Sequence, residues 1–240
     1  MRAAHERPGV APVAHERAPH ADPHAMAGLN THAIVLESLA GRTGTVADLG
    51  CGQGALSIEL ARRGFDVVCA DMSPEHFRMH AVPGIHGYLV DLNGGLPHRD
   101  RTFDVVCAVE IIEHLENPRH FLRECRRIVK DDGLVIVTTP NVLSLASRLS
   151  FLFRGCLIYF NQGEYERNHH ISPLRLTDFS NMFREVGLSL VRIDFNTGKL
   201  PIPKVRHWVP LTARAFRNVW LGESLIVWAS PARKAGGSHV

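Results

Sequence analysis

The chain has 240 residues, of which 45% are hydrophobic, and its formal net charge is +3. These values are ordinary for a globular protein of one domain, and so small a charge gives no independent indication of nucleic-acid binding. No apolar stretch reaches the roughly 20 residues that cross a bilayer, which argues against a transmembrane helix. Five cysteines without a C-x-x-C pair, and no secretory signal, favour a reducing, cytoplasmic location.

Both ends of the chain lack the apolar periodicity of packed structure. Residues 1–26 are rich in Ala, Pro, His and Arg, which predicts a disordered N-terminal tail. Residues 231–240 predict a flexible C-terminal tail. We therefore expect one domain over residues 27–230.

Apolar runs alternate with helical patterns along most of this domain. Ser73–Pro74 and Asn117–Pro118 are typical of a helix N-cap followed by the first helical residue. Gly187 is suited to end the helix before it. We expect helices over about 28–39 and 55–63, from 74, from 118 and up to 186, and strands over about 45–49, 66–70, 87–90, 103–109, 134–138, 188–193 and 224–229.

This alternation predicts an α/β fold with a Rossmann-like doubly wound sheet and helices on both faces. A helix followed by two strands in the last third predicts an antiparallel C-terminal edge strand on a mostly parallel sheet. Residues 141–170 are a long apolar connection, which we interpret as a lid over a substrate cleft or, alternatively, as a contact with a membrane surface. Residues 196–222 form an insertion before the last strand. Its basic, aromatic part at 199–220 favours a substrate arm, a dimer contact, a membrane contact or only a solvated basic face.

A glycine-rich turn follows the first strand, in the sequence VADLGCGQG at 46–54. Gly50, Gly52 and Gly54 alternate there after Asp48, and a helical pattern begins at once. Such a turn brings backbone N–H groups and a helix N-terminus close to a ligand, which a Cβ atom would block. The Lys-Ser/Thr pair of a phosphate loop is absent, so the motif favours a cofactor with a charged amino-acid tail over a pyrophosphate.

Acidic residues end three of the expected strands: Asp48, Asp71 and Asp91. Ligands of open α/β sheets bind at the carboxyl ends of the strands. Asp71 lies about 20 residues past the glycine turn, where an acid accepts hydrogen bonds from both hydroxyls of a ribose. One such Asp could merely cap a helix, but three around one glycine loop predict a nucleoside-bearing cofactor.

The segment FDVVCAVEIIEHL at 103–115 places Glu110, Glu113 and His114 just past the fourth expected strand. A substrate would face the cofactor at this position. Carboxylates and imidazole there can act as a general base, as cofactor contacts or as metal ligands. The alternative is that the acids solvate a loop and that the imidazole packs as an ordinary polar residue.

Taken together, VADLGCGQG, Asp71, Asp91, FDVVCAVEIIEHL and GLVIVTTPN resemble the class I S-adenosylmethionine-dependent methyltransferases over about residues 28–195. The Glu-x-x-Glu-His pattern is similar to two branches, the quinone-biosynthesis O-methyltransferases and the small-RNA 2′-O-methyltransferases. The resemblance implies that Glu110 and His114 are catalytic. It also implies a cofactor site of Asp48 and the loop residues Gly50, Cys51, Gly52 and Gly54 at the methionine end, Asp71 at the ribose, Met72, Asp91 and Leu92 at the adenine, and Glu110 facing the substrate.

The same resemblance implies a divalent metal ion, Mg²⁺ or another, bound by Glu110, Glu113, His114 and a later histidine. His169 and His170 both fit the later position, and the spacing from Leu174 leaves the choice open. An ion bound to substrate oxygens would lower the pKa of a hydroxyl and orient it. Mixed nitrogen and oxygen ligands would also accept Mn or Zn.

We therefore expect an S-adenosylmethionine-dependent methyltransferase that methylates a hydroxyl of a small-molecule, glycan or lipid- or quinone-type substrate. The partners that we expect are this substrate, a second copy of the chain, and a membrane surface in peripheral contact, with nucleic acid disfavoured. Two alternatives remain, a metal-dependent RNA 2′-O-methyltransferase and a non-catalytic binding protein of the same fold.

Overall fold

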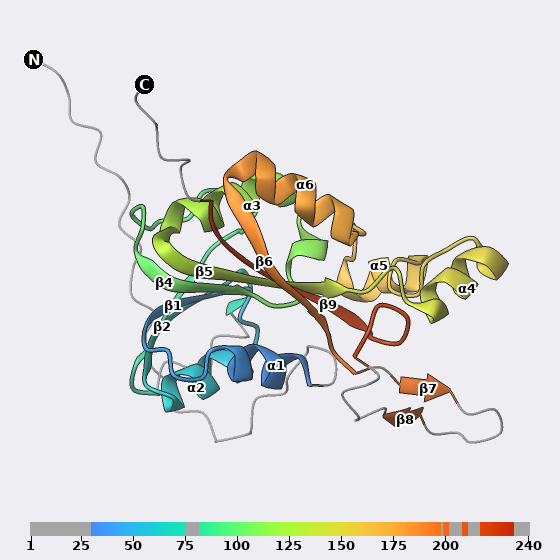
Figure 1. Ribbon diagram of the computed structural model, residues 1–240, viewed down its shortest axis with the longest axis horizontal. Coiled ribbons are helices and arrows are strands. Elements are labelled where there is room, and N and C mark those ends of the chain that lie inside the picture. Colours follow the sequence, from blue (N-terminus) through green and yellow to red (C-terminus); the bar gives the residue numbers. More distant parts are fainter. Residues whose placement is uncertain (1–29, 75–81, 198, 202–207, 211–216, 233–240) are drawn as a thin grey trace, which may run out of the picture.

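The computed structural model describes residues 30–74, 82–197, 199–201, 208–210 and 217–232 (Figure 1). Three sequence predictions lie wholly or largely outside these residues. They are the disordered tail over 1–26, the helix that was expected to continue from Pro74, and the C-terminal tail over 231–240. Most of the basic insertion at 199–220 also lies outside them.

In the described part of the chain, the main sheet has seven strands in the order β3-β2-β1-β4-β5-β9-β6. The first five in this order pair in parallel, and β9 pairs antiparallel with both β5 and β6. The predicted α/β sheet with an antiparallel C-terminal strand is thus confirmed, with β6 outermost beside it. The strands are β1 Gly44–Leu49, β2 Phe65–Asp71, β3 Ile85–Leu89, β4 Phe103–Ala108, β5 Val129–Pro140, β6 Leu188–Phe195 and β9 Ser224–Pro231.

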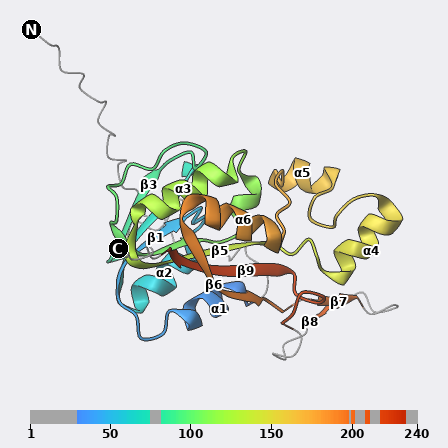
Figure 2. The same ribbon diagram turned by 45° about the horizontal axis from the view of Figure 1, so that its top comes forward.

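Helices cover both faces of this sheet (Figure 1). Helices α1 (Thr31–Ser38) and α2 (Ala55–Arg62) lie on one face, and α3 (Pro118–Ile128) and α6 (Leu176–Val186) lie on the other. Figure 2 shows the same layers from a second direction. Parallel strands joined by helices on alternate faces are the arrangement that the strand–helix alternation predicted.

The core consists of two apolar clusters, one on each side of the sheet. Strand β4 contributes to both, because successive side chains of a strand point to opposite faces. Val106 packs in the cluster with α3 and α6, while Val105 and Cys107 pack in the cluster with α1 and α2. Burial on both faces explains why the sequence of β4 is a nearly continuous apolar run. Packing on both faces of the sheet also holds the ends of β1, β2 and β4 rigidly in place.

Local sequence signals set several helix ends as expected. The side chain of Asn117 accepts a hydrogen bond from the backbone N–H of His120 at 3.0 Å, and Pro118 begins α3. Gly187 ends α6 with φ of 79°. Strand β5 begins at Val129, which pairs with Phe103, and so begins earlier than predicted. The prediction began later because the polar residues 130–132 carry no strand signal.

The connection over 141–170 contains two helices, α4 (Leu145–Arg154) and α5 (Gln162–Asn168). Both lie beyond the end of the sheet in Figures 1 and 2. The described part of the later insertion holds a small two-stranded sheet of β7 (Lys199–Pro201) and β8 (Trp208–Pro210). Among the helices of the described residues, none combines the length and the hydrophobicity that a membrane crossing requires.

Candidate active site

One cavity of about 880 Å³ opens at the carboxyl ends of the parallel strands. Its volume is within the usual range of a small-molecule site, about 300–1,000 Å³. Every predicted site residue except Gly54 lines it. The lining includes Asp48, Gly50, Cys51, Gly52, Asp71, Met72, Asp91, Leu92, Glu110, Glu113, His114, His169 and His170, and also Tyr159, Glu164, Glu223 and Ser224.

The glycine loop is held against β2 by its backbone. The N–H groups of Gly50 and Cys51 both donate to the carbonyl oxygen of Ala70, at 2.8 and 3.1 Å. Gly50 has φ of 76°, and a Cβ atom there would lie 2.5 Å from the side chain of Ile111. Gly54, with φ of 80°, is the residue before α2. Glycine at position 50 is therefore required both by its backbone conformation and by the space available.

Asp48 lies at the buried end of this site and is only 2% exposed. Its carboxylate accepts a hydrogen bond from the Ser57 hydroxyl at 2.6 Å, which ties β1 to α2. Burial raises the pKa of Asp48 to about 6, and the Ser57 hydrogen bond opposes this rise. A cationic ligand group beside it would favour the ionised carboxylate, so this position suits the ammonium group of a methionine moiety.

Asp71 stabilises the loop as well as facing the cavity. One carboxylate oxygen accepts from the backbone N–H of Gly52 at 2.8 Å, and the other from that of Ser73 at 2.9 Å. A carboxylate oxygen can accept more than one hydrogen bond, which suits this residue type to a ribose hydroxyl. The neighbouring Met72 is 73% exposed and lines the cavity, so its side chain is open to a flat ring.

Asp91 and Leu92 form the far wall of the same end. Leu92 is buried, whereas Asp91 is exposed and accepts from the backbone N–H of Asn93 at 2.9 Å. The three acids predicted from the strand ends thus face one cavity. This arrangement is the one that the sequence predicted for a nucleoside-bearing cofactor.

Glu110 stands where the chain leaves β4, with the left-handed φ of 51°. Its backbone N–H donates to the Thr138 hydroxyl at 2.9 Å, and that hydroxyl donates to the Glu110 carboxylate at 2.7 Å. Burial raises the pKa of Glu110 to about 7; the charge of Glu223 adds to this rise, while Thr138 and Ser224 oppose it. At neutral pH, Glu110 is therefore poised to exchange a proton.

Glu113, His114 and His170 form a cluster whose ligand atoms all lie within 4.8 Å of one another. Glu113 is fully buried, and neither of its carboxylate oxygens has a hydrogen-bond partner. Burial raises the pKa of Glu113 well above its ordinary value. The rings of His114 and His170 meet edge to face at 4.8 Å. A buried carboxylate without partners is costly unless something else satisfies it.

Backbone contacts bring this cluster together from distant parts of the chain. Glu113 and His114 lie on the short 3-10 helix η2 (Ile112–His114). The N–H groups of Ile171 and Ser172 both donate to the carbonyl oxygen of Glu113, at 3.0 and 2.9 Å. His170 is hydrogen-bonded through Nδ1 to the carbonyl oxygen of Tyr159 at 2.8 Å, which directs Nε2 away from that contact.

The structure separates the two histidines between which the sequence could not choose. His170 joins the cluster, whereas His169 ends α5 with φ of 56° and packs against the Tyr165 ring. Glu110, also predicted as a ligand, lines the cavity but is not among the clustered groups. Among the described residues, three of the candidate ligands, Glu113, His114 and His170, thus share one place.

Sequence reasoning did not identify Tyr159, Glu223, Ser224 or Thr138 as site residues. Glu223 had a signal that was available, because it is the one acidic residue between 199 and 240. Strand β9 brings Glu223 and Ser224 beside Glu110 through its antiparallel pairing with β5. Only that pairing reveals their place, since Glu223 and Ser224 lie far from Glu110 in the sequence.

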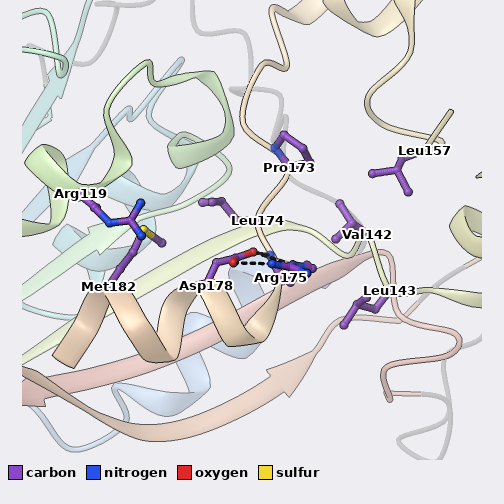
Figure 3. A pocket seen from close by; sticks show the side chains of 9 residues that line it. All are labelled: Arg119, Val142, Leu143, Leu157, Pro173, Leu174, Arg175, Asp178 and Met182. Carbon is purple, nitrogen blue, oxygen red and sulfur yellow. Dashed lines mark hydrogen bonds and ion pairs between the residues drawn. The ribbon is translucent and has the colours of Figure 1, made fainter. Parts of the chain in front are cut away.

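A second cavity of about 500 Å³ lies between α3, α6 and the segment that follows β5 (Figure 3). Its lining shares no residue with the first cavity. The charged groups at its rim are paired: Arg175 with Asp178 at 2.9 Å, and Arg119 with Glu185 at 2.8 Å. The remaining lining is mostly apolar, including Val142, Leu143, Leu157 and Met182. This cavity therefore has no evident acid–base chemistry.

Fold and site together define an α/β protein that binds a nucleoside-bearing cofactor at the carboxyl ends of its parallel strands. The comparisons with known proteins identify the family. A family model described as a methyltransferase domain matches residues 22–193. The chain belongs to this family and is a class I S-adenosylmethionine-dependent methyltransferase by sequence and fold.

Among curated proteins, the chain is 31% identical over 152 residues to a ubiquinone biosynthesis O-methyltransferase of Cereibacter sphaeroides, covering 60% of each chain. It is 37% identical over 112 residues to a mitochondrial ubiquinone biosynthesis O-methyltransferase of Schizosaccharomyces pombe, covering 44% of this chain and 41% of that protein. The chain thus spans about 60% of the length of the first of these relatives.

Solved structures share the fold at lower identity. A Bacillus halodurans protein assigned to the methyltransferases has a TM-score of 0.62 at 18% identity, covering 83% of this chain and 98% of that one. An S-adenosylmethionine-dependent methyltransferase of Mesorhizobium loti has a TM-score of 0.56 at 15% identity, covering 82% of this chain and 95% of that one. At these identities the likeness shows the fold alone.

Proposed function

We propose that this protein transfers the methyl group of S-adenosylmethionine to a hydroxyl oxygen of a quinone-type small molecule. The supporting observation is that one cavity joins the glycine loop and the three strand-end acids to Glu110 and the Glu113 cluster. The ubiquinone O-methyltransferases that the chain resembles support an oxygen atom as acceptor.

The protein's own residues would bind and orient the cofactor, which supplies an electrophilic methyl group. Asp48 and the loop around Gly50 would hold the methionine end, and Asp71 would accept from the ribose hydroxyls. Met72 and Leu92 would pack on the adenine, and Asp91 would accept from its amino group. Held in this way, the cofactor would supply its methyl group in the cavity that Glu110 lines, and the protein would have to orient the acceptor there.

Two groups on the acceptor side can take the proton of a substrate hydroxyl. Burial, with a smaller contribution from His170, lowers the pKa of His114, so this imidazole is neutral at pH 7. Glu110, with a pKa of about 7, is partly ionised there. Both groups line the cavity and are general-base candidates, His114 only where its imidazole does not bind a metal ion.

We also propose a divalent metal ion at Glu113, His114 and His170. The oxygens of buried Glu113, which lack a hydrogen-bond partner, and the nearby imidazole nitrogens fit such an ion. The bond from His170 Nδ1 to a backbone carbonyl is the contact by which metal-binding histidines are usually oriented. Two nitrogens and one carboxylate favour a transition ion such as Mn²⁺ or Zn²⁺ over Mg²⁺. An ion there would acidify and orient a substrate hydroxyl.

The cofactor assignment is tested by titration calorimetry with S-adenosylhomocysteine. Saturable binding is expected, and no binding at millimolar concentration would refute it. The acceptor assignment is tested by mass spectrometry after incubation with hydroxylated quinone precursors, where the gain of one methyl group is expected. Methylation of single-stranded RNA, and of no small molecule, would contradict the proposed acceptor.

The metal proposal has a matched control in the adjacent histidine. We expect His114→Ala and His170→Ala to lower the affinity for Mn²⁺ or Zn²⁺ by at least about tenfold, and His169→Ala to leave it unchanged. Titration calorimetry of the purified, chelator-treated protein measures this without any assay of activity. Equal affinity in all three variants would contradict the site.

A further inference from the structure

Helix α4 has the reverse of the usual polarity of a surface helix. Its buried residue is Ser147. The backbone N–H of Ser147 donates to the Ser144 hydroxyl, and the Ser147 hydroxyl accepts from the backbone N–H of Ile158. Its large apolar side chains are exposed instead: Phe151 by 60%, Leu152 by 72% and Phe153 by 78%. An amphipathic helix on a globular protein normally turns such residues inward. Much of the apolar surface of α4 is therefore left uncovered by the described chain.

The exposed residues do not form one stripe. Phe151, Leu152 and Phe153 are consecutive, so successive side chains are about 100° apart around the helix axis. Leu149 and Leu145, each a little under half exposed, extend the apolar surface toward the start of the helix. A groove on another protein would cover one face only. The acyl chains of a lipid layer can surround the end of the helix on several sides, which fits this pattern better than a groove does.

The charge of the segment favours an anionic surface. No acidic residue occurs from 141 to 161, whereas Arg148 and Arg154 both lie on α4. The guanidinium of Arg148 lies 4.4 Å from the centre of the Trp220 ring, and Trp220 is 50% exposed. Arginine and tryptophan beside exposed phenylalanine are the residue types that occupy the boundary between lipid headgroups and acyl chains.

The position of α4 leaves it free to meet a surface. It lies at the far end of the molecule from β1–β3, beyond the sheet, in both ribbon views (Figures 1 and 2). Its first turn is anchored, because the N–H of Leu145 donates to the carbonyl oxygen of Trp220 at 2.8 Å. With ten residues, the helix is about 15 Å long, half the hydrocarbon thickness of a bilayer, so it can lie in the interface but not cross.

We propose that α4, together with Trp220, is a docking surface for a membrane with anionic lipids. The chain after α4 leads directly to the cavity: Tyr159 and the α5 residues Glu164, Tyr165 and Arg167 line it. Docking would hold the mouth of the cavity near the bilayer. If the proposed function is correct, an acceptor with an apolar tail would reach the cavity from the membrane, but the docking itself does not depend on that function.

Vesicle co-sedimentation tests the proposal with the full-length protein. The probes are vesicles of phosphatidylcholine alone and of phosphatidylcholine with phosphatidylglycerol. We expect binding to the anionic vesicles that weakens as salt is added. The variant Phe151→Ser/Leu152→Ser/Phe153→Ser should lower the partition coefficient by at least about tenfold. Phe153→Trp, which keeps an interfacial aromatic, should bind like the wild type.

Two matched controls lie on other elements. Val191→Ser removes an apolar side chain that is 60% exposed on β6, and Arg184→Glu reverses an exposed charge on α6. Neither should change vesicle binding, whereas Arg154→Glu on α4 should weaken binding to anionic vesicles. An unchanged circular dichroism spectrum and melting temperature would show that each variant is folded.

Three outcomes would overturn the proposal. The first is wild-type protein that does not bind either kind of vesicle. The second is a triple serine variant that is folded and binds vesicles like the wild type. The third is that, in light scattering, the wild type is a dimer and the triple serine variant a monomer, and neither binds vesicles. In that case α4 would be an interface between two copies of the chain.

Discussion

The two ends of the cavity are built in different ways. The cofactor end comes mainly from one stretch of sequence, β1 to the loop after β3, in which each strand has an acid at or just past its carboxyl end. The acceptor end is assembled from η2, the segment around Tyr159 and His170, and the start of β9. One end therefore depends on local sequence, and the other on contacts between distant segments.

The carboxylates of the two ends also differ. At the cofactor end, Asp48 and Asp71 accept hydrogen bonds from Ser57, Gly52 and Ser73. At the acceptor end, the oxygens of buried Glu113 have no hydrogen-bond partner, and His114 Nε2 lies 4.0 Å from one of them. The cofactor end is thus preorganised by the protein alone, whereas the acceptor end has the arrangement of a site completed by a ligand.

The largest expected effect tests how rigid the cofactor end is. Gly50→Ala would place a Cβ atom 2.5 Å from Ile111 at φ of 76°, and we expect it to lower the free energy of unfolding by about 3 kcal/mol. Binding of S-adenosylhomocysteine should be lost. Thermal melting and calorimetry measure both. Gly41→Ala is the control, because Gly41 has the same φ of 76° and no atom within 4 Å of a new Cβ.

The next effect separates the acids of the cofactor end. Asp71→Asn leaves one acceptor oxygen for two backbone N–H donors, so we expect the affinity for S-adenosylhomocysteine to fall about 10- to 100-fold. The exposed residue Asp66 on the same strand provides the control, and Asp66→Asn should bind normally. Similar affinities for the two variants would show that Asp71 neither shapes the loop nor binds the ribose.

A smaller effect follows from the raised pKa of Asp48. Because the pKa is about 6 in the folded protein against 3.8 ordinarily, the folded state binds more protons between these values. The preference of the folded state for protonated Asp48 therefore adds to the free energy of unfolding. This addition is complete below pH 3.8 and is lost as pH rises through 6. Asp48→Asn should therefore raise the free energy of unfolding by about 1–2 kcal/mol at pH 8 and much less at pH 4.

Denaturant unfolding at the two pH values measures this difference. The same variant should bind S-adenosylhomocysteine more weakly, because the ammonium group loses its anionic partner. Equal stabilisation at both pH values would mean that the charge of Asp48 is not responsible.

The smallest expected effect concerns the acceptor end. Glu223 raises the pKa of Glu110 by its charge, so Glu223→Gln should shift the acidic limb of the pH–rate profile to lower pH, by about half a unit. Glu116→Gln, which changes an exposed acid of the same cavity, should leave the profile in place. An unchanged profile in Glu223→Gln would mean that Glu110 does not set that limb.

Much of the fold could be predicted because its signals are local. The apolar run of β4, the Asn117–Pro118 cap and the glycine that ends α6 each act within a few residues, and each was confirmed. Strand-end acids could be placed at one edge because parallel strands present their carboxyl ends together. The predictions for the cofactor end of the cavity were of this kind.

The acceptor end could not be predicted to the same depth. His169 and His170 are adjacent in sequence, and only the N–H contacts of Ile171 and Ser172 with Glu113 bring one of them into the cluster. The position of Glu223 depends on which strand β9 pairs with. Apolar residues in the connection after β5 were compatible with a lid or with a membrane contact, and the sequence could not show that those of α4 are exposed.

By itself, the sequence determined the alternation of strands and helices, the glycine loop and the acids around it. The reason is that backbone propensity and side-chain periodicity act over a few residues. The tertiary structure decided which histidine joins Glu113, which acid faces Glu110 and which side of α4 is exposed. These outcomes depend on long-range pairing and on burial, which result from packing the whole chain and from no single segment.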